Sequence, residues 1–354
     1  MAILGRHRGD IPRRRLARLF ASTMAVVGAC ALSLPAHADA VSDFYAGRTI
    51  SVLVGFGPGG GYDLYARTLA RHFGAHMPGT PNVVVRNEPG AAGFVLANGL
   101  YKVEPKDGTE FGTFDRTIPL DPLLGGARSQ FDPLKFSWLG SPSNEVSACV
   151  GWYTARAKSI EDLRTTEMLM AGTGSAADAT IYPTLFREVL GLRFKVVNGY
   201  QGAADSILAM QKGEVEGFCP WGWASIESSH PDWLRDHKIN VLMQLGLRKD
   251  PAHPDVPLVL DLAKTPADRQ ALELMLSPDL FARPFTAPPG VPADRLQALR
   301  TAFEATVKDP AFIDDAHKEG LEVEYVSGAE ILAVLQKIYA TPPDVVARVK
   351  AAVQ

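Results

Sequence analysis

The sequence is constrained most by two glycine-rich turns, each of which lies between a short β-branched or apolar run and a helical pattern. The first turn, GPGGG at 57–61, follows TISVLVG at 49–55 and precedes apolar residues at helical spacing from Leu64 to Phe73. The second turn, GTGS at 172–175, follows MLMA at 168–171 and precedes a helix that we expect to end near Leu190. Apolar runs bounded by such turns are typical of buried strands. Both turns therefore predict the strand-to-helix step of an α/β fold.

The same alternation extends over most of the chain. We expect further strands at 82–86, 109–113, 146–153, 194–197, 215–218 and 239–245, and helices at 93–102, 203–212, 293–308, 310–319, 329–339 and 343–352, with another helix opening at 159–164. Alternating strands and helices predict parallel sheets covered by helices. We predict two α/β domains with a ligand cleft between them: residues 41–143 plus 245–354, including the C-terminal helices, and residues 144–244. Ligands of such sheets bind where strands lead into helices.

The amino terminus has the form of a secretory signal peptide. Six arginines precede an apolar, small-residue run at 19–34, which ends in PAHADA at 35–40. A basic start, a short apolar core and an Ala-x-Ala exit predict export and cleavage after Ala38 or Ala40. Two variants stay open, a lipid anchor at Cys30 and twin-arginine export, and both lead to the same compartment. We therefore expect residues 1–40 to be removed and the mature protein to be periplasmic.

The charge of the mature chain limits its partners. The leader holds six arginines and two aspartates, so its removal changes the formal net charge from −3 to −7. An acidic body argues against a nucleic-acid partner, which needs a basic face.

Two cysteines, Cys149 and Cys219, follow the leader. In an oxidising compartment they can form one disulfide, or they can remain two buried thiols. Because both are expected near strand ends of one domain, we favour a structural disulfide.

The chemistry of the two turns points to an anion. Glycines allow close approach of a ligand to the backbone, and the free amides at a helix start favour a carboxylate or phosphate. The alternative is that each is only a tight turn. Residues 55–60 also satisfy G-x-G-x-x-G, but the second expected strand ends at Arg86-Asn87, without the acidic residue that a dinucleotide ribose requires. A dinucleotide site is therefore not predicted.

From Phe44 onward the chain resembles the substrate-binding receptors of tripartite tricarboxylate transporters, the Bug-type periplasmic proteins. The similar segments follow in the family's order: FGPGGGYD at 56–63, VRNEPGAAG at 85–93, PKDGT at 105–109, FDPL at 131–134, GYQG at 199–202 and GEVEG at 213–217. The resemblance implies a two-domain flytrap that holds a small organic carboxylate between two loops, here 56–63 and 172–178, largely through backbone amides and water. It also implies a monomer that delivers this ligand to integral-membrane transporter subunits. The departures are Ala176, Ala177 and Asp178 in the second loop and the aromatic CPWGW at 219–223.

The candidate ligand-binding residues come from both loops and from the expected cleft: Phe56, Gly57, Pro58, Gly59, Gly60, Gly61, Asn87, Arg116, Gly174, Ser175, Ala176, Tyr200 and Trp221. Arg116 can bind a carboxylate bidentately or pair with Asp115. Tyr200 and Trp221 can line the pocket or pack in the core. Asp63 is expected to cap its helix, and Asn87 to brace the neighbouring loops.

Motifs for catalysis or metal binding are lacking in the sequence. Ser175 does not lie in a G-x-S-x-G elbow, and His72 and His76 share a helix face without a recognisable third metal ligand. We therefore predict a non-enzymatic receptor, without cofactor or metal, that works by binding and hinge closure. The alternatives are an exported hydrolase or oxidoreductase, and a sensory receptor that signals through a membrane kinase. Citrate-like acids, aliphatic dicarboxylates, aromatic carboxylates and acidic amino acids all remain open as ligands.

Overall fold

The structure is a computed structural model of the 354-residue chain, and it describes residues 36–175 and 177–353. The predicted leader lies outside the described residues except for its last five positions, and the lipid-anchor alternative at Cys30 and the site residue Ala176 also lie outside them. Within the described part of the chain, no helix combines the length and the apolar character that a bilayer span requires.

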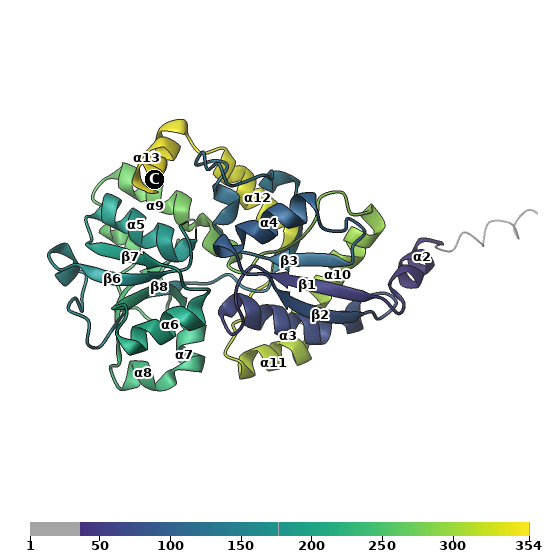
Figure 1. Ribbon diagram of the computed structural model, residues 1–354, viewed down its shortest axis with the longest axis horizontal. Coiled ribbons are helices and arrows are strands. Elements are labelled where there is room, and N and C mark those ends of the chain that lie inside the picture. Colours follow the sequence, from purple (N-terminus) through teal and green to yellow (C-terminus); the bar gives the residue numbers. More distant parts are fainter. Residues whose placement is uncertain (1–35, 176, 354) are drawn as a thin grey trace, which may run out of the picture. The chain divides into compact units, whose positions relative to one another are not determined.

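Two sheets form the framework of the molecule (Figure 1). The six-stranded sheet has the order β11-β4-β10-β3-β1-β2. Its strands are β1 (Thr49–Val54), β2 (Asn82–Asn87), β3 (Glu110–Thr113), β4 (Ser137–Ser141), β10 (Phe285–Ala287) and β11 (Val326–Ser327). We call this sheet and the helices on it lobe 1.

Lobe 2 is built on the five-stranded sheet, whose order is β7-β6-β8-β5-β9. Its strands are β5 (Ser147–Trp152), β6 (Met168–Gly172), β7 (Phe194–Asn198), β8 (Gly217–Gly222) and β9 (Ile239–Leu245). The chain crosses from lobe 1 to lobe 2 after β4 and returns before β10, so lobe 1 is discontinuous in sequence.

Helices cover both faces of each sheet (Figure 1). On lobe 1, α3 (Gly61–His76) and α11 (Pro310–Lys318) lie on one side, and α4 (Phe94–Lys102) and α12 (Gly328–Tyr339) on the other, while α10 (Ala293–Lys308) packs on α3 and β4. On lobe 2, α5 (Asp178–Leu190) lies opposite α6 (Ala203–Lys212), α7 (Trp223–Ser229) and α8 (Pro231–Arg235). The helix α2 (Ala36–Tyr45) precedes β1.

The C-terminal helices divide between the lobes. The predicted boundaries placed all of them with the first domain, and α10, α11 and α12 do contact lobe 1. In contrast, α9 (Pro266–Leu276) and α13 (Pro343–Val353) pack against α5 of lobe 2. Residues from Val41 onward consequently form one compact unit.

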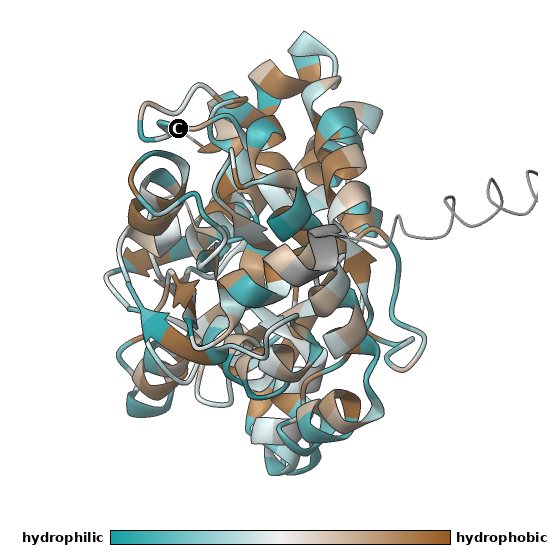
Figure 2. Cartoon of the chain, turned by 90° about the vertical axis from the view of Figure 1, so that its right-hand side faces the viewer, coloured by the Kyte–Doolittle hydropathy of each residue, from teal (hydrophilic) through white to brown (hydrophobic). Residues whose placement is uncertain are grey.

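The core follows from the apolar strands. All six residues of β8 are buried, as are the last five of β1, because helices cover both faces of each sheet. The helices carry apolar and polar residues side by side, which suits elements that bury one face against a sheet (Figure 2).

Two expectations about the secondary structure were wrong. Both sheets are mixed and not parallel, since β5 runs antiparallel to β8 and β9, and β10 runs antiparallel to β3 and β4. The helix expected to open at 159–164 is only the short 3-10 turn Asp162–Arg164. Strand direction is decided by distant pairing partners, whereas the sequence pattern reports only local burial.

Candidate binding site

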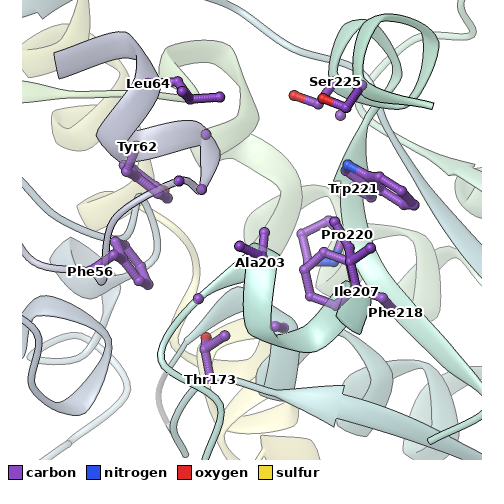
Figure 3. A pocket seen from close by; sticks show the side chains of 18 of the residues that line it. Phe56, Tyr62, Leu64, Thr173, Ala203, Ile207, Phe218, Pro220, Trp221 and Ser225 are labelled. Atoms are coloured by element: carbon purple, nitrogen blue, oxygen red, sulfur yellow. The ribbon is translucent and has the colours of Figure 1, made fainter. Parts of the chain in front are cut away.

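A cavity of about 310 Å³ lies between the two lobes (Figure 3). Its lobe 1 side is the turn between β1 and α3, including Phe56, Gly59, Gly60 and Gly61. Its lobe 2 side consists of the start of α6 and the end of β8, including Ala203, Pro220 and Trp221. The first predicted turn therefore does face a cleft between the lobes.

The first turn presents free backbone amides to this cavity. Gly60 is the N-cap of α3, with an extended backbone (φ −89°, ψ 169°) and no side chain capping it. The amides of Gly60, Gly61 and Tyr62 have no hydrogen-bond partner in the described part of the chain. Such amides at a helix start carry partial positive charge and favour an anion.

Asp63 and Asn87 hold the turn in place. Asp63 does not cap the helix as expected: its Oδ2 accepts from the Gly59 amide at 2.8 Å, one residue before the N-cap, and from Arg67 Nε at 2.8 Å. The Asn87 side chain donates to the Phe56 carbonyl at 3.0 Å and to Asp63 Oδ1 at 2.7 Å. Asn87 is not among the residues that line the cavity, so its position is that of a brace.

The start of α6 faces the first turn directly. The Gly57 amide donates to the Gln201 carbonyl at 3.3 Å, which joins the two lobes. A Cβ atom placed on Gly60 would lie 3.6 Å from the Ala203 amide nitrogen. The amino-terminal ends of α3 and α6 thus converge on one cavity from opposite lobes, and their partial charges favour an anion between them. Gly57 and Pro58 themselves are not lining residues.

The second predicted turn contributes differently from what the sequence suggested. Thr173, Asp178 and Ala179 line the cavity, but Gly174 and Ser175 do not. The Ser175 hydroxyl accepts a hydrogen bond from Arg128 and lines a separate pocket. The segment GYQG at 199–202, placed by β7, occupies the position that we expected for Gly174 and Ser175. The segment 199–202 lies there because β7 pairs with β6, and the sequence of the turn at 172–175 gives no indication of this pairing.

Arg116 lies in the cavity wall but is already paired. It is 1% exposed, and its guanidinium is within 3.1 Å of Asp178 Oδ2, 3.0 Å of Asp279 Oδ1 and 3.8 Å of Glu145 Oε2. The contacts of Nε and Nη1 are close enough for ion pairs without meeting hydrogen-bond geometry. Pairing with Asp115 was one of the alternatives for Arg116, and its ion-pair partners come instead from lobe 2 and from the two crossover segments.

Asp115 is a buried carboxyl at the junction of the lobes. It accepts from the Thr117 amide at 2.8 Å, from the Thr117 hydroxyl at 2.6 Å and from the Asp178 amide of lobe 2 at 3.2 Å. Burial and the neighbouring Asp178 carboxylate raise the pKa of Asp115 to about 8. Burial likewise raises the pKa of Asp279 to about 6, although Arg116 opposes this shift.

The remaining wall is mainly apolar (Figure 3). Phe56 stacks on Tyr62 with ring centroids 4.6 Å apart. Trp221 lines the cavity from the lobe 2 side, which is one of the two places that the sequence left open for it. Tyr200 is not a lining residue, and it is a half-buried side chain packed against the apolar cluster of lobe 2.

Several residues that line the cavity were not predicted from the sequence. The Ser147 hydroxyl is buried and has no hydrogen-bond partner within the described residues. Arg283 pairs with Glu145 at 2.7 Å and lies over the Tyr62 ring. At Gly222 a Cβ atom would overlap Glu145 Oε1 at 1.4 Å, so only glycine fits this close approach. The polar start of β5 was a weak signal for Ser147, whereas nothing local marked Arg283.

The two mature cysteines form a disulfide between the central strands of lobe 2. Cys149 on β5 and Cys219 on β8 are fully buried, with Cα atoms 4.3 Å apart. This is the alternative that the sequence analysis favoured.

His72 and His76 pair with carboxylates beside α3. Each Nε2 lies 2.9 Å from a carboxylate oxygen, of Asp315 and Asp309 respectively. No cluster of three or more potential metal ligands occurs among the residues that the structure describes.

Comparison with known proteins identifies the fold. No known family profile matches the chain. A UPF0065 protein of Bordetella pertussis is 23% identical over 329 residues, which cover 86% of this chain and 90% of the relative. The solved structure of the periplasmic binding protein BugD matches with a TM-score of 0.69 at 20% identity, covering 87% of this chain and 98% of that one. MatC from Rhodopseudomonas palustris, solved with bound malate, matches with a TM-score of 0.66 at 17% identity, covering 87% and 99%.

The fold is therefore that of the two-domain periplasmic binding proteins, and the predicted fold class is confirmed. The match to the periplasmic binding protein BugD agrees with the resemblance to Bug-type proteins that the sequence motifs indicated.

Proposed function

We propose that this protein is an exported solute-binding receptor of the periplasm. It captures a small organic carboxylate between its lobes and delivers it to a tripartite tricarboxylate-type membrane transporter. It acts as a monomer, by binding and hinge closure without chemical conversion of the ligand. The ligand-binding residues proposed here are the first turn, the start of α6 and the cavity wall that includes Arg116 and Trp221.

One observation carries this proposal. The amino-terminal ends of α3 and α6, one from each lobe, converge on a single cavity with free amides at Gly60, Gly61 and Tyr62. An anion at the start of α3 satisfies these amides and lies against the start of α6 of the other lobe, so binding and lobe closure are coupled. The match to MatC, a protein solved with bound malate, supports a carboxylate as this anion.

The test is thermal unfolding of the mature protein with a panel of carboxylates and their neutral amides. A ligand that binds only the folded state stabilises it by RT ln(1 + L/Kd), where L is the free ligand concentration, so the midpoint of unfolding rises with ligand concentration. We expect a clear rise for one or more carboxylates and none for the matching amides.

A matched pair of variants tests the site. Gly60→Leu places a side chain between the two helix starts, where even a Cβ atom lies 3.6 Å from the Ala203 amide, and it should abolish the rise. Ser175→Leu changes a residue of a separate pocket and should keep it. The proposal is wrong if no carboxylate raises the midpoint, or if both variants respond as the unaltered protein does.

A further inference from the structure

We infer that the cavity selects a monocarboxylate with an apolar aromatic or branched aliphatic body, and discriminates against di- and tricarboxylates. This inference rests on the proposed function and names the ligand class of the same site. The single carboxylate lies at the converging starts of α3 and α6, and the apolar body lies against Trp221 and its neighbours.

The cavity holds no uncommitted cation for a second carboxylate. Both lining arginines are already paired, Arg116 with Asp178 at 3.1 Å and Arg283 with Glu145 at 2.7 Å. Among the described lining residues none is a lysine, and burial lowers the pKa of the lining His230, which favours its neutral form.

The two lining guanidinium groups, of Arg116 and Arg283, share the wall with two lining carboxyl groups, of Asp178 and Glu319, and have further acidic neighbours behind it. Asp115, Glu145, Asp178 and Asp279 surround the two arginines, and Asp178 itself lines the cavity. A second ligand carboxylate would be desolvated beside a wall whose guanidinium charges are already balanced by carboxylates, and a buried charge without a partner is costly.

The apolar residues that line the cavity suit an apolar ligand body. Phe56, Tyr62, Ile207, Phe218, Pro220 and Trp221 face the cavity from both lobes (Figure 3). At about 310 Å³ the cavity is at the small end of ligand pockets, which fits one compact ring or branched chain.

Among the described lining residues outside the charged cluster, Ser147 supplies a buried polar side chain without a hydrogen-bond partner, and this side chain is neutral. The Ser147 hydroxyl is 1% exposed at the residue level, lines the cavity and has no hydrogen-bond partner among the described residues. A hydroxyl donates to or accepts from a neutral substituent, but it does not compensate the charge of a carboxylate.

The experiment is calorimetric titration of the mature protein with a matched series. Benzoate and cyclohexanecarboxylate present one carboxylate on an apolar ring, terephthalate adds a second carboxylate, adipate lacks the ring, and benzamide lacks the charge. We expect at least one ring monocarboxylate to bind tenfold or more tightly than terephthalate and adipate, and benzamide not to bind. Tighter binding of terephthalate or adipate overturns this inference but leaves the proposed function intact. If no carboxylate in the series or in the broader panel binds, both are overturned.

A gain-of-selectivity variant tests the same idea without loss of function. Ile207→Arg places an unpaired cation in the apolar wall of α6, and the ratio of adipate to cyclohexanecarboxylate affinity should rise at least tenfold. Val197→Arg adds the same charge to an exposed position of lobe 2 that does not line the cavity, and should leave the ratio unchanged. An unchanged ratio in Ile207→Arg contradicts the inference.

Trp221→Ala tests the apolar contact directly. Because Trp221 supplies a large part of the wall, affinity for cyclohexanecarboxylate should fall tenfold or more. Trp152→Ala, which removes a tryptophan of the same lobe outside this cavity, should have no such effect. Equal affinities of the two variants would place the ligand body elsewhere.

Discussion

Asp115 and Asp178 come from different lobes, yet the Asp178 amide donates to the Asp115 carboxylate across the junction. From the sequence, Asp115 was expected only as a possible partner of Arg116. In the structure it is a fully buried acid whose pKa is raised to about 8, mainly by burial and then by the Asp178 carboxylate. The free energy of unfolding should therefore depend on pH through the ionisation of Asp115.

The sign of this dependence follows from proton binding. An unfolded aspartate has a pKa of about 3.9, so between that pH and 8 the folded state holds a proton at Asp115 that the unfolded state has lost. The contribution to stability is complete below about pH 4 and is lost as the pH rises through 8.

We predict that Asp115→Asn reduces the loss of stability between pH 5 and pH 8 by about 1–4 kcal/mol relative to the unaltered protein. An amide keeps the shape and cannot ionise. Urea unfolding at several pH values measures the difference, with the exposed Asp255→Asn as the control. Parallel pH profiles for the unaltered protein and Asp115→Asn would contradict the raised pKa.

At the scale of elements, lobe 2 is held together by a covalent link between two of its strands. The disulfide joins Cys149 of β5 to Cys219 of β8, and 70 positions of sequence separate them. These residues include β6, α5, β7 and α6, so the link restricts most of lobe 2 in the unfolded chain.

We predict that the double variant Cys149→Ala, Cys219→Ala lowers the free energy of unfolding of lobe 2 by about 4 kcal/mol, the loop-entropy value for a closed loop of this length. Tryptophan fluorescence during urea unfolding is a suitable readout, because Trp152, Trp221, Trp223 and Trp233 all lie in lobe 2. The matched control is the unaltered protein, oxidised and fully reduced. A midpoint that neither reduction nor substitution changes would show that the disulfide is dispensable.

At the scale of the whole molecule, buried charges connect the two lobes. Arg116 follows β3 of lobe 1, and its partners lie in lobe 2 (Asp178) and in the crossover segments (Glu145 and Asp279). The Gly57 amide and the Gln201 carbonyl add a direct contact between the lobes. The guanidinium of Arg116 thus lies among carboxyl groups from three parts of the chain and contributes to the arrangement of the lobes.

We predict that Arg116→Met destabilises the protein by about 3–5 kcal/mol at pH 8, because it leaves buried carboxylates without their cation. The loss should be smaller at pH 5, where the raised pKa values of Asp115 and Asp279, about 8 and about 6, favour protonated and uncharged acids. Urea unfolding at both pH values measures this. Arg128→Met, at an exposed arginine beside Ser175, is the control. A loss independent of pH would mean that Arg116 acts through packing alone.

Much of the local structure was predictable from sequence, since it depends on patterns that the chain carries locally. The predicted bounds of α6, α10 and β9 agree with the structure, and GPGGG does lead from β1 into α3. Apolar spacing reports which face of an element is buried, and glycine-rich turns report where a strand ends. The first turn could for this reason be placed near a cleft before any tertiary structure was known, whereas for Trp221 the sequence left a place in the pocket wall and a place in the core both open.

The tertiary structure alone decided what faces that turn. GYQG at 199–202 and the start of α6 lie opposite it, whereas Ser175 lies in another pocket, because the order of β6, β7 and β8 sets which lobe 2 loop reaches lobe 1. The charge of Arg116 is compensated by carboxyl groups that are distant in sequence, and Arg283 lines the cavity without any local signal in the sequence. Such contacts depend on the path of the whole chain, so the sequence by itself determined the elements and the glycine-rich turn at the start of α3, while the packing of the two lobes determined the charge and shape of the cavity.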